Sequence, residues 1–250
     1  MPNAVVEVRN LRKTYGQKVA VADVSFAVAP GEIFGILGPN GSGKSTAVEC
    51  IAGLRDADGG YIRILGVDPQ VHPELIRAHV GVQFQEAGLH DKITVHEALT
   101  LFASFYDTPA DVEELLHVLG LTDKRHARFR SLSGGQKQRV SIALALVGNP
   151  KVAILDELTT GLDPQARRTT WEVVRRVRDT GATVLLVTHF MDEAERLCDR
   201  LVIIDHGRII AEGSPQDLIS SVGGARSLED VFVAITAKPA AVPAARGASR

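Results

Sequence analysis

Short runs of apolar residues alternate along the chain with segments in which apolar residues recur every three or four positions. The apolar runs predict buried strands, and strands that alternate with helical segments are typical of an α/β protein with a mostly parallel sheet. The predicted strands cover residues 4–9, 19–28, 32–37, 61–65, 80–84, 152–156, 183–188, 200–205 and 208–212.

The middle of the chain has a different pattern. Residues from about 94 to 148 contain no convincing strand, and the segments TVHEALTLFASFY, DVEELLHVLG and GGQKQRVSIALALVG carry apolar residues at helical spacing. We therefore predict one domain over residues 1–236, with an inserted helical subdomain at about 88–150. Residues 237–250 lose this periodicity and are rich in Ala, Pro and Gly, so we expect a disordered tail.

Charge, cysteine content and apolar runs exclude only a few classes of function. Lys and Arg number 28 against 30 Asp and Glu, so no global charge favours nucleic acid, and we expect no nucleic-acid partner. The two cysteines, Cys50 and Cys198, lie in apolar segments without metal-binding spacing, so we expect buried free thiols. The sequence contains neither an apolar run long enough to cross a membrane nor a signal-peptide pattern, which favours a cytoplasmic chain.

The stretch GPNGSGKS, residues 38–45, follows an apolar run and precedes a helical segment. It fits the pattern G-x-x-x-x-G-K-[ST], in which backbone N–H groups surround phosphate oxygens, the lysine reaches the β- and γ-phosphates, and the hydroxyl binds Mg²⁺. The alternative is a glycine-rich turn with an exposed lysine. The residues predicted to bind nucleotide here are Gly38, Pro39, Asn40, Gly41, Ser42, Gly43, Lys44, Ser45 and Thr46, with Ser45 also a candidate ligand of the metal.

Two adjacent carboxylates end the apolar run KVAILDE at residues 151–157. One acid at the end of a buried strand can hold Mg²⁺, and the next can polarise the water that attacks the γ-phosphate. We assign Asp156 to the metal and Glu157 to the general base. The alternative is an acid that caps the following helix.

The segment LSGGQKQR at residues 132–139 predicts a helix start. Ser133 and Gln136 have the spacing of a capping box, and Gly134 and Gly135 leave the helix N-terminus open to an anion. Capping alone would also explain this pattern.

In this order, GPNGSGKS, LSGGQ and ILDE resemble the ATP-binding subunit of ABC transporters, over residues 5 to about 215. The resemblance implies an α/β fold: a P-loop NTPase core with a mostly parallel sheet, N-terminal antiparallel strands and an inserted helical subdomain. It also implies a homodimer that pairs head to tail, with each ATP and its Mg²⁺ held between one phosphate loop and the LSGGQ of the other chain.

Further positions match the family one at a time. The resemblance implies that Tyr15 stacks on adenine and that Gln85 senses Mg²⁺, although Gln83 lies nearby. It implies that Asp163 lies in the loop that crosses the dimer interface, and that His189 contacts the γ-phosphate. The structural alternatives are a strand-edge tyrosine, a surface glutamine, a helix-capping aspartate and a histidine that merely ends a strand.

The chain departs from the commonest family pattern at Leu158, where proline usually follows the acid pair, so the loop could be slightly less rigid. DELTTGLDPQARR, VTHFMDEAERLCDR and SLEDVFVAIT resemble the bacterial exporters of drugs and antibiotics. That resemblance implies integral membrane permease subunits as partners and a place on the cytoplasmic face of the cell membrane. Two alternatives from other classes are a stand-alone nucleotide kinase and a soluble regulatory ATPase of the same type.

Overall fold

A computed structural model describes residues 4–83 and 88–236 of the chain. Nine strands in the described residues form one sheet in the order β4-β1-β2-β9-β8-β3-β7-β6-β5. In chain order the strands are β1 (Val6–Tyr15), β2 (Lys18–Val28), β3 (Ile33–Leu37), β4 (Gly59–Ile64), β5 (Val80–Gln83), β6 (Val152–Asp156), β7 (Thr183–Thr188), β8 (Arg200–Asp205) and β9 (Arg208–Gly213).

The parallel half of the sheet is formed by β8, β3, β7, β6 and β5. Every residue of β3 and of β7 is buried, as expected for strands that are covered on both faces. The central strand β3 pairs with β7 on one side and β8 on the other, so the loop after β3 begins at the middle of the parallel edge.

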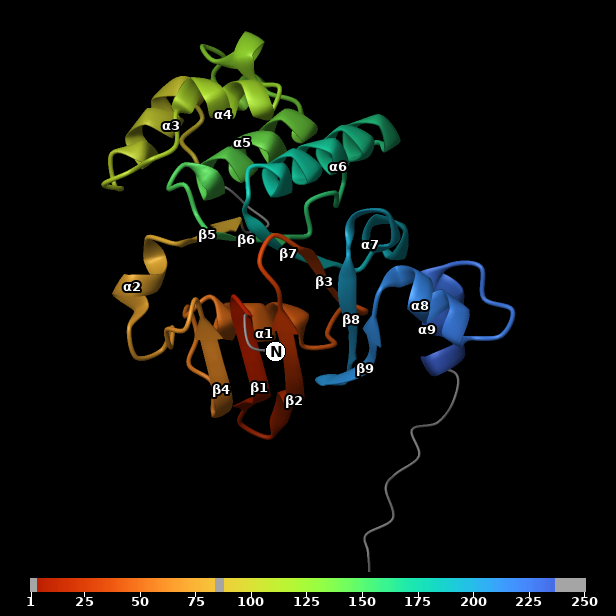
Figure 1. Ribbon diagram of the computed structural model, residues 1–250. Helices are drawn as coiled ribbons and strands as arrows, with labels where there is room; N and C mark the ends of the chain where they lie inside the picture. The colour runs from red at the N-terminus through yellow and green to blue at the C-terminus, as the bar shows by residue number, and fades with distance from the viewer. Residues whose placement is uncertain (1–3, 84–87, 237–250) are drawn as a thin grey trace, which may run out of the picture.

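The antiparallel half curls over the first helix, α1 (Lys44–Ile51). Strand β1 pairs antiparallel with both β2 and β4, and Figure 1 shows these strands at the front of α1. Val48 and Ile51 of α1 share one apolar core with residues of β1, β2, β3 and β8. Burying each of these side chains contributes about 1.5–3 kcal/mol, so α1 is held from both halves of the sheet.

The helical subdomain lies between β5 and β6 in the chain and at the top of Figure 1. Its helices are α3 (Val95–Ala103), α4 (Val112–Val118) and α5 (Gly134–Leu146), with short 3₁₀ turns at Thr122–Lys124 and Phe129–Ser131. Capping boxes start α3 at Thr94 and α5 at Ser133. These caps satisfy backbone N–H groups that have no partner within the helix.

The second apolar core lies on the other face of the sheet and contains residues of α5, α6 (Pro164–Asp179) and α7 (Met191–Leu197). The remaining helices are α2 (Pro73–Arg77), α8 (Pro215–Ser221) and α9 (Leu228–Thr236). Leu228 and Val231 of α9 are buried in this second core, so the end of the described chain belongs to the fold.

The structure confirms the predicted α/β class, the mostly parallel core, the N-terminal antiparallel strands and the inserted helices. The first strand was predicted to end at residue 9 but continues to Tyr15, because its polar second half pairs with β2 in a hairpin. The predictions for residue 84 and for the tail at 237–250 lie outside the described residues. Cys50 and Cys198 are free and buried, as expected.

No helix within residues 4–83 and 88–236 is both long enough and apolar enough to cross a membrane.

Candidate functional site

The phosphate loop connects β3 to α1 and packs directly against two other strands. A Cβ atom on Gly38 would lie 2.1 Å from the carbonyl oxygen of Ile204, and one on Gly43 would lie 2.3 Å from that of Ala20. Gly43 also has a φ of 106°, in the region that favours glycine. Only glycine fits at either position, and the loop is therefore fixed by the backbones of β8 and β2.

The outer part of the loop is open. Gly41 has a φ of 81°, and a Cβ atom there would meet nothing within 4 Å. The N-terminus of α1 has no side-chain cap, since Gly43 occupies the capping position. Uncapped N–H groups at a helix N-terminus attract anions, so this end of α1 suits a phosphate.

Lys44 is the first residue of α1, at the end of this loop, and is almost fully buried. Its Nζ donates to the carbonyl oxygens of Gly38 at 2.8 Å and Pro39 at 2.9 Å. Burial lowers the pKa of Lys44, whereas the nearby carboxylates of Glu157 and Asp156 raise it. The lysine side chain thus folds back onto the start of its own loop, near both predicted acids.

Asp156 ends β6 and faces the same region. Its Oδ1 atom is buried and makes no hydrogen bond to any described residue. Burial and the neighbouring Glu157 raise the pKa of Asp156 to about 6, while Lys44 acts in the opposite direction. An oxygen ligand that is buried but unsatisfied fits a divalent cation, because Mg²⁺ prefers carboxylate and hydroxyl oxygens.

Glu157 and His189 are brought together by adjacent strands. Glu157 follows β6 with a φ of 49°, and its N–H donates to the carbonyl oxygen of Val187 in β7 at 2.9 Å. Oε1 of Glu157 lies 3.2 Å from Nδ1 of His189, which follows β7. Both side chains are mostly buried, with 17% and 26% of their surface exposed. The predicted base and the predicted γ-phosphate contact therefore form one pair.

Tyr15 lies at the end of β1 and is 41% exposed. The Cζ atom of Arg55 lies 5.3 Å from the ring centroid and Nζ of Lys13 lies 5.8 Å from it. These contacts fix an aromatic ring at the surface of the antiparallel half, where it remains accessible.

The LSGGQ segment and Asp163 form a second, separate group. Ser133 caps α5 and Asp163 caps α6, and both line a hollow of about 190 Å³. A Cβ atom on Gly135 would lie 3.1 Å from that of Ala166, so the two helix starts pack closely. No residue of the phosphate loop lines this hollow. Within one chain, the predicted nucleotide site is therefore present in two separate parts.

Gln85 lies outside the described residues. Its neighbour Gln83 is buried at the end of β5, and its Oε1 accepts a hydrogen bond from the N–H of Asp156 at 3.2 Å. Leu158, where the chain departs from the commonest family pattern, is fully buried in the core shared by α5, α6 and α7. This burial anchors the loop that leads to Asp163.

The sequence reasoning missed Glu193 of α7. Its side chain is fully buried and accepts a hydrogen bond from Nε1 of Trp171 in α6 at 3.0 Å. Burial raises the pKa of Glu193, and the bond ties α7, which follows His189, to α6, which follows Asp163. In the sequence, Glu193 is one of several acids beside the apolar positions of MDEAERLC. An acid in such a helix usually lies on the exposed face, so nothing in the pattern indicated that this one is buried.

A glycine-rich loop between a central parallel strand and a helix, with an acid pair at the end of a neighbouring strand, defines a P-loop NTPase. The model of the ABC transporter family matches residues 21–160. The Nod factor export ATP-binding protein I of Paraburkholderia xenovorans (strain LB400) is 46% identical over 234 residues, covering 92% of this chain and 77% of that protein. The protein of the same name from Rhizobium etli is 43% identical, covering 90% of this chain and 72% of that protein.

Solved structures agree with the sequence comparison. The ATP-binding subunit of an ABC transporter superposes with a TM-score of 0.82 at 33% identity, over 93% of this chain and 99% of that one. An ATP-binding cassette of an ABC transporter in its ADP conformation superposes with a TM-score of 0.77 at 26% identity, over 92% and 98% of the two chains. The chain belongs to the ABC transporter family, as an ATP-binding subunit.

The raised pKa of Asp156 predicts a pH-dependent stability of the nucleotide-free protein. The pKa of this carboxyl is about 6 in the folded state and has its ordinary value near 3.8 when the chain unfolds. The folded state therefore favours the protonated form of Asp156. As the pH rises from about 4 through 6, the carboxyl loses its proton more readily in the unfolded chain, so the free energy of unfolding falls. Asp156→Asn cannot ionise, so its free energy of unfolding relative to wild type should increase by roughly 2 kcal/mol between pH 4 and pH 7.

Urea denaturation at pH 4.5 and pH 7.5 in EDTA measures this change. Asp107→Asn, which alters an exposed aspartate, is the matched control and should show no such trend. A difference between Asp156→Asn and wild type that does not change with pH would contradict the burial of a charged carboxylate at this position.

Proposed function

We propose that this chain binds and hydrolyses ATP as a dimer and thereby powers export through a separate membrane permease. The observation that carries the proposal is the meeting of Lys44, Asp156, Glu157 and His189 at one edge of the sheet. Lys44 lies near both acids, and Glu157 lies 3.2 Å from His189. This arrangement supports a site where a phosphate, a metal and an attacking water are held side by side.

Each residue then has a role in ATP hydrolysis. The open N–H groups around Gly41 and the start of α1 bind the phosphates, and Lys44 exchanges its two carbonyl partners for phosphate oxygens. The residues that would hold Mg²⁺ are Asp156, Ser45 and Gln85, and Mg²⁺ when bound neutralises charge on the phosphate oxygens. Glu157 accepts the proton of the water, and His189 orients Glu157 through Nδ1. Tyr15 provides an exposed ring for adenine.

Two substitutions should fail at different steps. Lys44→Ala removes the phosphate contact and should weaken ATP binding itself. Glu157→Gln keeps the shape of the side chain and removes the base, so ATP should still bind while hydrolysis falls by about 10²–10⁴-fold and the ATP-bound dimer accumulates. Gel filtration with Mg-ATP and an ATPase assay measure both effects. A monomeric Glu157→Gln protein with normal hydrolysis would refute the assignment of the base.

The separation of the two halves of the site supports a dimer. The hollow beside Ser133 and Asp163 contains no phosphate-loop residue, which supports a role for the α5 N-terminus at a nucleotide that a second chain presents. Gly134 and Gly135 leave this N-terminus accessible, and its positive end stabilises phosphate charge. We infer a head-to-tail homodimer in which Ser133, Gly134, Gly135, Gln136 and Asp163 complete the partner's site.

Mixed dimers test this arrangement. Lys44→Ala and Ser133→Arg should each be nearly inactive alone. A mixed dimer contains one whole site, built from the phosphate loop of one chain and the LSGGQ of the other. With random pairing and independent sites, an equal mixture should recover about a quarter of wild-type ATPase activity. A covalently linked mixed dimer is the control, and if it is inactive when assembled with the permease, the role of Ser133 in the partner's site is wrong.

The coupling to a permease is supported by a hollow of mixed apolar and charged lining at the edge of the sheet. It measures about 930 Å³ and lies between α2, β5 and the chain that follows α3. Leu54 and Phe105 line it and are 59% and 70% exposed. Exposed apolar residues around a hollow mark interaction sites. We propose that a short helix of the permease occupies this hollow. The relatives' names specify export, and we propose the same direction here, with a drug, antibiotic or lipid-like cargo that the permease selects.

Phe105→Glu should separate ATP hydrolysis from permease binding. The charge disrupts an apolar contact that lies outside the nucleotide site, so the isolated subunit should keep its ATPase activity and lose the permease during affinity purification from a detergent extract. Leu101→Glu on α3, which is 49% exposed and does not line the hollow, is the control and should retain the permease. If the wild-type chain brings down no membrane protein, the soluble regulatory ATPase becomes the better description.

A further inference from the structure

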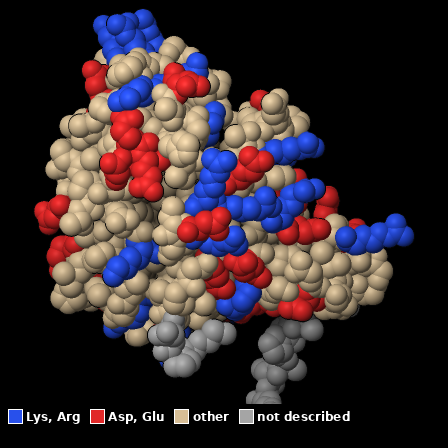
Figure 2. Space-filling model, turned by 45° about the horizontal axis from the view of Figure 1, so that its top comes forward, with Lys and Arg blue, Asp and Glu red and all other residues tan. Residues whose placement is uncertain are grey.

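A basic hollow lies between α6 and α7, outside both parts of the nucleotide site. It measures about 370 Å³. Four arginines line it against two acids, and the lining residues are Pro164, Arg167, Arg168, Trp171, Glu172, Arg175, Asp192 and Arg196. Figure 2 shows several Lys and Arg side chains, with Asp and Glu side chains among them, in the part of the surface where these helices lie.

Of the four arginines, only Arg167 forms an ion pair with an acid among residues 4–83 and 88–236. Arg167 donates to both carboxylate oxygens of Asp192, at 3.0 Å and 3.2 Å. Arg175 donates to the backbone carbonyl of Arg196, which leaves its charge uncompensated. Within the part of the chain that the structure describes, Arg168 and the guanidinium group of Arg196 form neither an ion pair nor a hydrogen bond.

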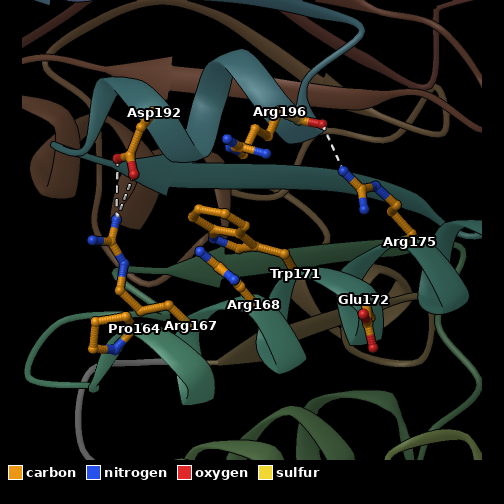
Figure 3. Close-up of a pocket in the computed structure, with 8 residues that line it drawn as sticks. All are labelled: Pro164, Arg167, Arg168, Trp171, Glu172, Arg175, Asp192 and Arg196. Carbon is orange, nitrogen blue, oxygen red and sulfur yellow. Dashed lines mark hydrogen bonds and ion pairs between the residues drawn. The ribbon is translucent and has the colours of Figure 1, made fainter.

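The floor of the hollow is the indole of Trp171. It is 8% exposed, and Arg167 and Arg196 lie 5.5 Å and 5.4 Å from its ring. Figure 3 shows the side chains of Arg167, Arg168 and Arg196 gathered around it. Trp171 is itself held by Glu193 at 3.0 Å, so the hollow has a rigid base from which the cationic groups project.

Uncompensated cations that share a hollow repel one another, and an anion bound between them removes that cost. The planar guanidinium group matches phosphate and carboxylate oxygens in pairs. We propose that this hollow, between Arg168 and Arg175 of α6 and Arg196 of α7, binds a compact anion with two or more negative charges, either phosphoryl or carboxylate. The site lies outside the nucleotide-binding residues, and its ligand is distinct from the ATP that is hydrolysed.

The chain contains its own reporter, because Trp171 is the only tryptophan. Pyrophosphate and citrate, titrated separately into the Lys44→Ala protein in low-salt buffer with EDTA, represent the two ligand chemistries. At least one of them should change the Trp171 fluorescence in a saturable way, with one anion per chain by calorimetry. Potassium chloride at the same ionic strength controls for general screening.

The arginine variants decide where the anion binds. Combining Arg168→Gln with Arg196→Gln should weaken binding by about tenfold or more, since two charge-assisted contacts are lost. Arg178→Gln removes the same charge from the same helix outside the hollow and should leave binding unchanged. Arg168→Gln alone changes an exposed side chain that forms no hydrogen bond or ion pair with the described residues, and it should give part of the loss if the double variant folds poorly. A lack of saturable binding by both anions, or equal affinity in wild type and these variants, would overturn the proposal.

Discussion

Backbone atoms of the phosphate loop touch backbone atoms of two other strands, with no room for a side chain between them. Gly38 packs on the carbonyl of Ile204 and Gly43 on that of Ala20, while the N–H of Gly207 donates to the carbonyl of Ser42 at 2.8 Å. These contacts join the loop to β2 and to the turn between β8 and β9. The antiparallel half of the sheet is therefore needed to shape a loop that grows out of the parallel half.

The strand order then determines which side chains can meet that loop. Because β3 pairs with β7, and β7 with β6, the carboxyl ends of all three strands lie at one edge. This places Lys44, Asp156 and His189 together although they are far apart in sequence. Glu157 reaches His189 from a left-handed backbone conformation, with a φ of 49°. Leu158, directly after it, is fully buried in the core on the other face of the sheet.

Much of this was predictable because local patterns and local chemistry coincide. The buried strands 152–156, 183–188 and 200–205 were predicted with their observed bounds, and the caps at Ser133 and Asp163 follow from residue type and spacing. The sequence could not show which side chains from distant parts of the chain lie in contact. The pairing of Glu157 with His189, the bond between Gln83 and Asp156, and the burial of Glu193 against Trp171 all depend on strand order and helix packing. The second half of β1 was missed because its exposed polar residues hide the alternation that indicates a strand.

The contact between α6 and α7 connects two parts of the candidate site, Asp163 and His189, that lie apart in the sequence. Helix α6 is capped by Asp163, beside the LSGGQ segment, and α7 begins just after His189, which pairs with Glu157. Contacts between these helices include Arg167 with Asp192, Trp171 with Glu193, and Arg175 with the backbone carbonyl of Arg196. Arg167 also lies 4.6 Å from the ring of Phe190, which packs on His189. A shift of α6 against α7 would therefore move Asp163 relative to His189. The basic hollow lies at this contact between α6 and α7, so an anion bound between Arg168 and Arg196 would favour the packing in which the two helix starts keep their present spacing.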